Sequence, residues 1–203
     1  MCIRDRFYTI LDDVFALRDM DDAADGGKVK ERYNGSGATV RGFNVEGRAA
    51  FTRWFELQAG VTLQQSRYKE PEFWSEDAEV PPVRRMFRTP DAYGYFTASF
   101  KPVRNFTADL SGTCTGSMLV QHMAGSGVAQ DVAVSTPSFF DMNIRLSYDV
   151  RIYKEITMQL YGGVQNLFNA YQKDFDKGVD RDSGYIYGPS LPRSWFVGAK
   201  FSF

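Results

Sequence analysis

The chain has 203 residues, with 24 Lys and Arg against 25 Asp and Glu, so its formal net charge is −1. This balance excludes a strongly basic surface, and general nucleic-acid binding therefore lacks its main driving force. No run of about 18 apolar residues is present to make a membrane helix, although the strands of a membrane β-barrel are only half apolar and escape that criterion. We expect no enzyme, because the sequence has no nucleophile elbow, phosphate loop or zinc spacing, and its single histidine has no second histidine to pair with.

The first six residues, MCIRDR, resemble a leader that is common on open reading frames translated from truncated metagenomic contigs. They lack the basic start and apolar core of a signal peptide. We expect a non-native leader over 1–6, native sequence from about Phe7, and a true start upstream. The two cysteines, Cys2 and Cys114, show no metal or redox spacing.

Apolar and polar residues alternate over long stretches, which is typical of strands with one apolar face. The pattern predicts a first strand, with blurred alternation, three hairpins with tight turns, and a last strand that ends the chain. In order these are 6–17, then 39–51 with 55–68, 92–100 with 106–120, 138–150 with 156–164, and 195–203. Helical periodicity is absent. The sequence therefore predicts an all-β, antiparallel up-and-down meander of about eight long strands.

The connections alternate strictly between short and long. The long ones are polar and cover roughly 18–36, 69–90, 121–137 and 168–192. Loops beyond about 12–15 residues are uncommon in compact domains and are usually functional or disordered. We therefore expect tight turns at one end of the sheet and long loops at the other.

Alternation alone does not decide whether the apolar face points into a soluble barrel or out to lipid. Three features favour lipid: strands of about ten or more residues, short turns at one end only, and aromatic residues near strand ends. These aromatic residues are Trp54, Phe55, Phe100, Phe106, Tyr153, Trp195 and Phe203. With a periplasmic C-terminus, all four long connections are extracellular and the three short turns are periplasmic. A soluble, lipocalin-like carrier is the remaining alternative from the pattern.

Two segments near the C-terminus carry a resemblance to a known family. YGGVQNLFNAY (Tyr161 to Tyr171) and YGPSLPRSWFVGAKFSF (Tyr187 to Phe203) resemble the closing two strands of TonB-dependent outer-membrane receptors. The hairpin GFNVEGRAAFTRWFELQAGVTLQQSRY (Gly42 to Tyr68) resembles an internal hairpin of the same barrels.

The resemblance implies a 22-stranded barrel with a plugged lumen in the outer membrane of a Gram-negative bacterium. Residues 7–203 would be the C-terminal part of that transmembrane β-barrel domain, with the plug domain absent. The implied function is active uptake of a scarce nutrient, of the iron–siderophore, haem, cobalamin or glycan class, with no cofactor. The implied partners are outer-membrane lipid and the TonB motor complex, which acts through the plug.

An isolated segment of this kind should form a curved, open sheet of eight strands, in which the first and last strands are the edges and do not pair with each other. The alternative function is that of a small, complete eight-stranded barrel, acting as a passive pore or a surface-binding protein.

The last strand resembles the signal that the barrel-assembly machinery reads. The resemblance places Trp195, Val197, Phe201 and Phe203 in that signal. In a closed barrel this strand would also pair with the first one, which removes an exposed edge.

Exposed aromatic residues and one histidine of the outer loops are the candidate ligand contacts, although anchoring at the level of lipopolysaccharide explains the aromatic ones equally well. They are Trp74, His122, Tyr185 and Tyr187. His122 lies near Met118 and Met123, which could join it on copper or haem iron, but we expect ordinary loop residues and no metal.

The acidic stretches 174–184 and 18–27 would suit calcium by composition. Their spacing is not that of an EF-hand, so solvated loop charge is expected. On the inward face, Arg145 with Asp141 and Asp149, and Glu46 with Arg48, could pair across neighbouring strands. Such charges would grip the plug in a plugged barrel or set the selectivity of an open channel, and we favour the plug.

Overall fold

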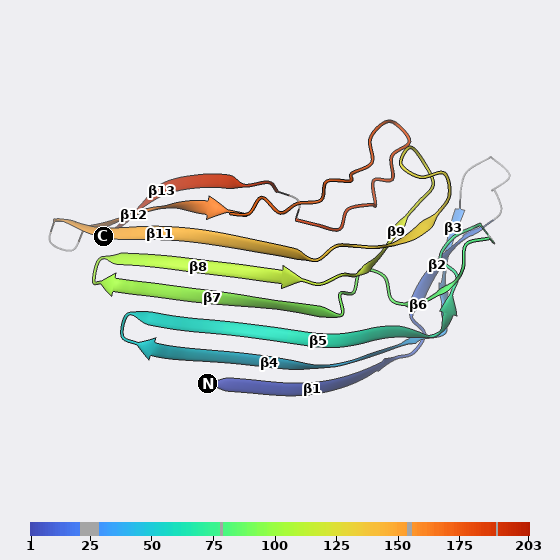
Figure 1. Ribbon diagram of the computed structural model, residues 1–203, viewed down its shortest axis with the longest axis horizontal. Helices are drawn as coiled ribbons and strands as arrows, with labels where there is room; N and C mark the ends of the chain where they lie inside the picture. The colour runs from blue at the N-terminus through green and yellow to red at the C-terminus, as the bar shows by residue number, and fades with distance from the viewer. Residues whose placement is uncertain (21–28, 78, 154–155, 190) are drawn as a thin grey trace.

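The computed structural model describes residues 1–20, 29–77, 79–153, 156–189 and 191–203. Eight long strands follow one another across a single antiparallel sheet (Figure 1). They are β1 (Cys2–Leu11), β4 (Ala38–Thr52), β5 (Phe55–Glu72), β7 (Ala92–Val103), β8 (Phe106–Thr115), β11 (Phe139–Tyr153), β12 (Ile156–Gln165) and β13 (Ser194–Ser202). The predicted meander of eight long strands is confirmed.

The three tight turns fall where the alternation predicts them. Thr52 and Phe55 flank the first, and Val103 and Phe106 flank the second. The third follows Tyr153, and its residues 154–155 lie outside the described part of the chain. All three lie at the same end of the sheet, which we call the short-turn end (Figure 1).

The opposite end, the long-loop end, has more regular structure than the sequence predicts. Within the long connections, β2 (Phe15–Met20) pairs with β3 (Val29–Asn34), β6 (Val83–Arg85) pairs with β5, and β9 (Leu119–His122) pairs with β10 (Val132–Ser135). The acidic stretch 18–27 lies mostly outside the described residues, so its predicted solvated charge stays a prediction.

Two predicted strands are interrupted. The strand expected over 6–17 ends at Leu11, because Asp13 takes a left-handed conformation (φ 54°) and the chain turns into β2. The strand expected over 106–120 ends at Thr115, and its last residues belong to β9. Residues 2–6 lie in β1 and pair with β4, so backbone pairing alone does not distinguish them from the rest of the strand.

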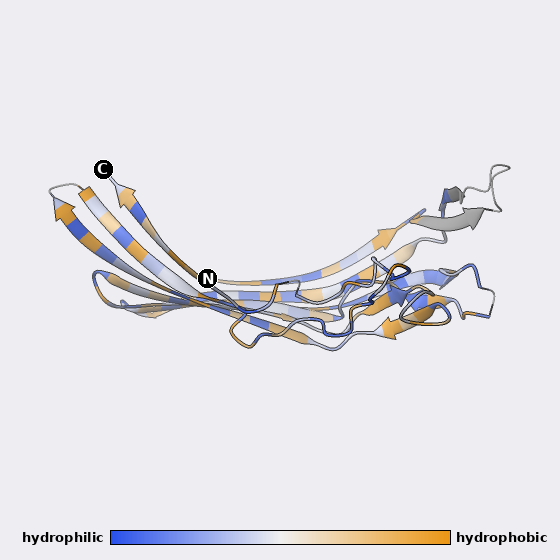
Figure 2. Cartoon of the chain, turned by 90° about the horizontal axis from the view of Figure 1, so that it is seen from above, coloured by the Kyte–Doolittle hydropathy of each residue, from blue (hydrophilic) through white to orange (hydrophobic). Residues whose placement is uncertain are grey.

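Register gives the sheet one apolar and one polar face. Directly paired residues form rows across the strands, and paired residues of a row point to the same face. One apolar row runs Val45, Val61, Gly94, Cys114 and Phe140. The next apolar row, two residues closer to the short-turn end, includes Phe96, Gly112 and Met142. The rows that alternate with the apolar ones carry polar residues, for example Asn44, Thr62, Tyr93 and Thr115. Apolar and polar colours alternate accordingly along each strand (Figure 2).

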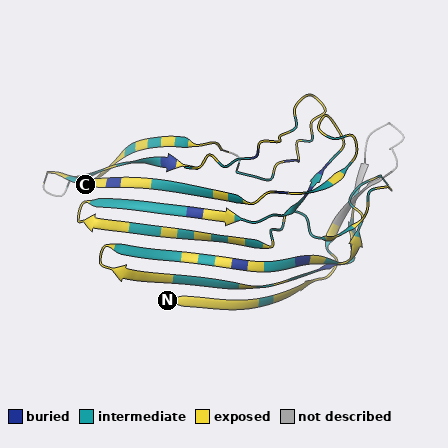
Figure 3. Cartoon of the chain, in the orientation of Figure 1, coloured by how far each residue is buried: buried dark blue, intermediate teal, exposed yellow. Residues whose placement is uncertain are grey.

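The sheet is open and bowed, and β1 and β13 form its two edges (Figures 1 and 2). Most strand residues are exposed or half-buried (Figure 3). Val197 of the last strand and the terminal residue Phe203 are 90% and 97% exposed. In the part of the chain described, the buried apolar residues are Ala38, Val120, Val164 and Tyr185, all toward the long-loop end. The expected open sheet with unpaired first and last strands is therefore confirmed.

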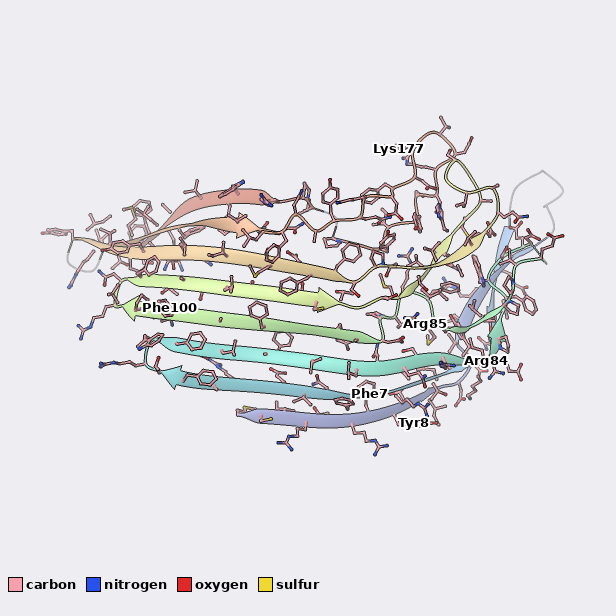
Figure 4. The ribbon with its side chains drawn as sticks, in the orientation of Figure 1. Phe7, Tyr8, Arg84, Arg85, Phe100 and Lys177 are labelled. Atoms are coloured by element: carbon pink, nitrogen blue, oxygen red, sulfur yellow. The ribbon has the colours of Figure 1, made fainter. Side chains whose placement is uncertain are left out.

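Aromatic rings gather at the short-turn end. The ring of Trp54 lies edge-on to that of Phe100 at 5.1 Å, and Phe51 stacks on Phe55 at 5.7 Å. Figure 4 shows Phe100 at this end of β7. Such a cluster fits the aromatic girdle predicted for one membrane interface. Separately, the described residues include no helix long and apolar enough to cross a bilayer, a result that does not bear on spans made of strands.

Candidate functional site

The long loops form a layer at the long-loop end, and the last of them, residues 166–193, packs against the end of β9 and the segment 123–126 that follows it. Its first turn is built by Asn166, whose side chain donates to the backbone oxygens of Ala170 and Leu191 and accepts from the amide of Ala170. Asn166 and Asn169 both take left-handed conformations, with φ of 49° and 54°, which asparagine tolerates better than most residues. The NLFNAY segment thus sets the path of the loop.

His122 joins the last loop to β9. Its Nε2 atom lies 2.9 and 3.0 Å from the two carboxylate oxygens of Asp176, and its ring stacks on Tyr185 at 3.7 Å with an angle of 7°. The side chains of His122 and Asp176 are 7% and 4% exposed. The hydrogen bond from His122 holds the pKa of Asp176 below its ordinary value. The predicted loop histidine is therefore a buried link between segments 54 residues apart.

Asp174 forms the second half of this network. It accepts hydrogen bonds from the hydroxyls of Tyr185, at 2.9 Å, and Tyr187. Burial alone would raise the pKa of Asp174, but the hydrogen bonds from Tyr187 and Tyr185 outweigh it and lower the pKa overall. Burial and the bond to Asp174 raise the pKa of Tyr185 to about 12 and raise that of Tyr187 as well.

Other contacts complete the closure of the loop. Gln172 is fully buried, donates to the carbonyl of Tyr185 at 3.0 Å and accepts from the amide of Tyr187 at 2.9 Å. Arg88, from the second long connection, donates to the backbone oxygens of Gly184 and Ile186. We call His122, Asp174, Asp176, Tyr185 and Tyr187 the loop latch. Sequence reasoning missed the part played by Gln172 and Arg88, because nothing in their local sequence indicates such distant partners.

Two predictions about these loops are wrong. Tyr185 was expected as an exposed aromatic residue, yet it is 3% exposed. The carboxylates of 174–184 were expected to be solvated charge, but Asp174 and Asp176 belong to the latch, and Asp182 accepts from the amides of Met123 and Gly184. Contact of the latch residues with a ligand stays a prediction.

Trp74 lies apart from the latch. Its indole Nε1 donates to the carbonyl of Pro81 at 3.3 Å, and its ring lies edge-on to Phe87 at 5.3 Å. It lines a cavity of about 230 Å³ between the first, second and third long connections. The four candidate contacts therefore divide between two places, three in the latch and one in this cavity.

No group of three or more His, Cys, Asp and Glu side chains suited to a metal ion occurs among the residues that the structure describes. At His122, Nε2 is engaged by Asp176. The side chain is thus held by a carboxylate from its own chain.

The inward charges pair differently from expectation. Arg48 forms its ion pair with Glu56 on the neighbouring strand, while Glu46 accepts from Gln58 at 2.8 Å. Arg145 lies 4.7 Å from the centre of the Tyr161 ring. Asp149 accepts from Gln159 at 2.8 Å. The predicted pairs Arg145 with Asp141 or Asp149, and Glu46 with Arg48, are therefore wrong in this arrangement.

An open, bowed meander with one apolar and one polar face, tight turns at one end and a loop layer at the other has the architecture of part of an outer-membrane β-barrel. Comparison with solved structures agrees. The ferric-catecholate import receptor Fiu of Escherichia coli K12 matches 98% of this chain with a TM-score of 0.63 and 18% identity, over 24% of its own length. The ferric enterobactin receptor PfeA of Pseudomonas aeruginosa matches 98% with a TM-score of 0.64 and 15% identity, over 28% of its length.

The copper transporter OprC matches the whole chain with a TM-score of 0.63 and 12% identity, over 29% of its length. This chain thus spans about a quarter of the receptors that it resembles. At these identities the likeness is one of fold, and it confirms the expected resemblance to part of the barrel of TonB-dependent outer-membrane receptors. No protein-family model matches the sequence, and no curated protein matches it.

Proposed function

We propose that this chain is the C-terminal part of the barrel of a TonB-dependent outer-membrane transporter that takes up a scarce nutrient. The observation that carries the proposal is that nearly the whole chain superposes on about a quarter of three such transport proteins. All three are receptors or transporters. Iron–siderophore, haem, cobalamin or a glycan is the proposed class of nutrient.

The two faces of the sheet support a place in the outer membrane. The apolar face would contact lipid, and the polar face would contact the plug domain through which the TonB motor complex acts. In this orientation the long-loop end is extracellular and the C-terminus is periplasmic. Trp195, Val197, Phe201 and Phe203 would serve the barrel-assembly machinery; 53% of Phe201 and 76% of Trp195 are exposed, so they are available to a partner.

Register bears on the expectation that residues 1–6 are not native. Arg4 pairs with Val45 and Arg6 with Phe43, so both arginines fall in rows of the apolar face. An arginine on the lipid face of a barrel costs about 2–4 kcal/mol at the bilayer midplane. Farther along β1 the same face carries Tyr8 and Ile10, which pair with Arg41 and Thr39. Because Arg41 also falls on this face, native sequence from about Phe7 stays a prediction.

The test is the DNA sequence upstream of the codon for Phe7 in the source genome. A reading frame that continues through further amphipathic strands to a plug domain and a signal peptide would support the proposal. A signal peptide directly before Phe7 would overturn it in favour of a complete eight-stranded barrel. That alternative requires β1 and β13 to pair, whereas they form opposite edges of the described sheet.

A further inference from the structure

Five of the eleven residues that line the cavity beside Trp74 are aromatic. They are Phe15, Tyr68, Phe73, Trp74 and Phe87. Phe15 and Phe73 are 73% and 65% exposed although they line it, so their rings are open to an incoming molecule. None of the lining residues belongs to the loop latch. The cavity is therefore a separate place for binding.

One carboxylate completes this wall. Glu72 is the one charged residue in the lining. The hydroxyl of Tyr33 donates to its Oε1 atom at 2.8 Å, which holds the side chain in place. Gly35 packs so closely that a Cβ there would lie 3.3 and 3.4 Å from the two carboxylate oxygens. Among the described residues no Lys, Arg or His forms an ion pair with Glu72, so its negative charge is open to a ligand.

One aromatic ring of the lining, that of Phe15, already lies beside a cation. The guanidinium carbon of Arg32 lies 5.8 Å from the centre of the Phe15 ring. A positive charge over an aromatic face gains about 0.5–2 kcal/mol, and several rings around one ammonium group form the cage that recognises methylated amines. A carboxylate at the same place favours a cation and disfavours an anion.

We propose that this cavity binds an organic ammonium ion with small apolar substituents, of the tertiary or quaternary amine class. The methyl groups would cover the rings of Trp74, Phe87 and Tyr68, and the positive charge would face Glu72. A neutral molecule of the same shape would gain the apolar contacts alone. The inference concerns binding only and holds whether or not the protein transports its ligand.

The test compares choline with 3,3-dimethylbutan-1-ol, which replaces the nitrogen of choline by carbon and so removes the charge at constant shape. Binding to the complete protein in detergent micelles is measured by isothermal titration calorimetry. We expect saturable binding of choline and at least about tenfold weaker binding of the alcohol. Equal binding of the two, or no saturable binding of choline, would overturn the proposal.

Two glutamate variants locate the effect. Glu72→Gln keeps the size of the side chain and an acceptor for Tyr33, and it should weaken choline binding about tenfold while leaving the alcohol unchanged. Glu70→Gln removes an equal charge from an exposed position of the same strand, outside the lining, and should leave choline binding unchanged. An equal loss in both variants would mean unspecific attraction to the acidic surface and would contradict the site.

Discussion

At the scale of single residues, the loop latch joins five loop side chains into one hydrogen-bonded cluster, in which those of His122, Asp176 and Tyr185 are buried. The ring of His122 is held from the side by Asp176 and from its face by Tyr185. Asp174 then ties Tyr185 to Tyr187. Buried polar groups of this kind are costly unless each has its partner, so the cluster favours one arrangement of the last loop. The last loop is thereby fixed against the end of β9.

The latch should be stable only within a window of pH. The pKa values of Asp174 and Asp176 are lowered by the closed loop, so their contribution is present above the ordinary aspartate value of about 3.9 and is lost as the pH falls below it. The pKa of Tyr185 is raised to about 12, so its contribution is present below the ordinary tyrosine value of about 10 and is lost as the pH rises toward 12. We expect slow amide exchange at Tyr185 and Tyr187 between these limits and faster exchange outside them, measured by hydrogen–deuterium exchange corrected for the intrinsic effect of pH.

Two neighbouring aspartates make this measurement specific. Asp176→Asn should speed exchange in the last loop at neutral pH and reduce its change on acidification. Asp180→Asn should do neither, because residue 180 contacts Ser126 through its backbone carbonyl alone among the hydrogen bonds described. Identical exchange in both variants would show that the latch does not hold the loop.

At the scale of elements, alternation predicted the long strands well because their two faces meet different surroundings. The tight turns followed from the short breaks between alternating stretches, and Pro102 lies in β7, just before the turn at 104–105. The short strands of the loops were missed because four residues, as in Val132–Ser135, are too few for a period of two to stand out. The latch was missed because its partners are joined by loop packing over 54 residues, which no local pattern encodes.

Close packing between β7 and β8 gives a test at this scale. Phe96 pairs directly with Gly112, and a Cβ at residue 112 would collide with the Phe96 ring. Gly112→Val should therefore lower the free energy of unfolding by about 1–3 kcal/mol, as overpacking generally does. The measurement is urea unfolding of the complete protein in detergent micelles.

The neighbouring position and a double variant serve as controls. Thr113 lies next to Gly112 on the opposite, polar face and is exposed. Thr113→Val should therefore change the free energy of unfolding by less than about 0.5 kcal/mol. Removing the ring as well, in Phe96→Ala with Gly112→Val, should cost less than the sum of the two single changes, because the collision is gone. Strictly additive losses would show that the ring and residue 112 do not meet.

At the scale of the whole molecule, the sheet is unfinished in two ways. Both faces carry exposed side chains, and both edge strands present unpaired backbone groups (Figures 1 and 3). Open edges invite pairing with other chains. A β-sheet spans a bilayer only as a closed barrel, in which no edge is left unpaired. Lipid on one face, a plug on the other and further strands at both edges would satisfy all of these groups at once. The described part of the chain therefore supplies the contacts of its loop layer, but it does not supply partners for the two faces and the two edges of its sheet.

One experiment on barrel closure distinguishes a segment of a larger transporter barrel from a complete eight-stranded barrel. A closed membrane barrel resists unfolding in cold SDS and migrates faster on a gel before heating than after, whereas an open sheet has edges from which it can unravel. We expect residues 7–203, refolded alone in detergent, to migrate identically with and without heating, or to associate through β1 and β13. The complete gene product, refolded in parallel as the positive control, should show the shift on heating. A compact, heat-sensitive monomer of residues 7–203 alone would mean that β1 and β13 do pair, and the complete eight-stranded barrel would replace the transporter segment.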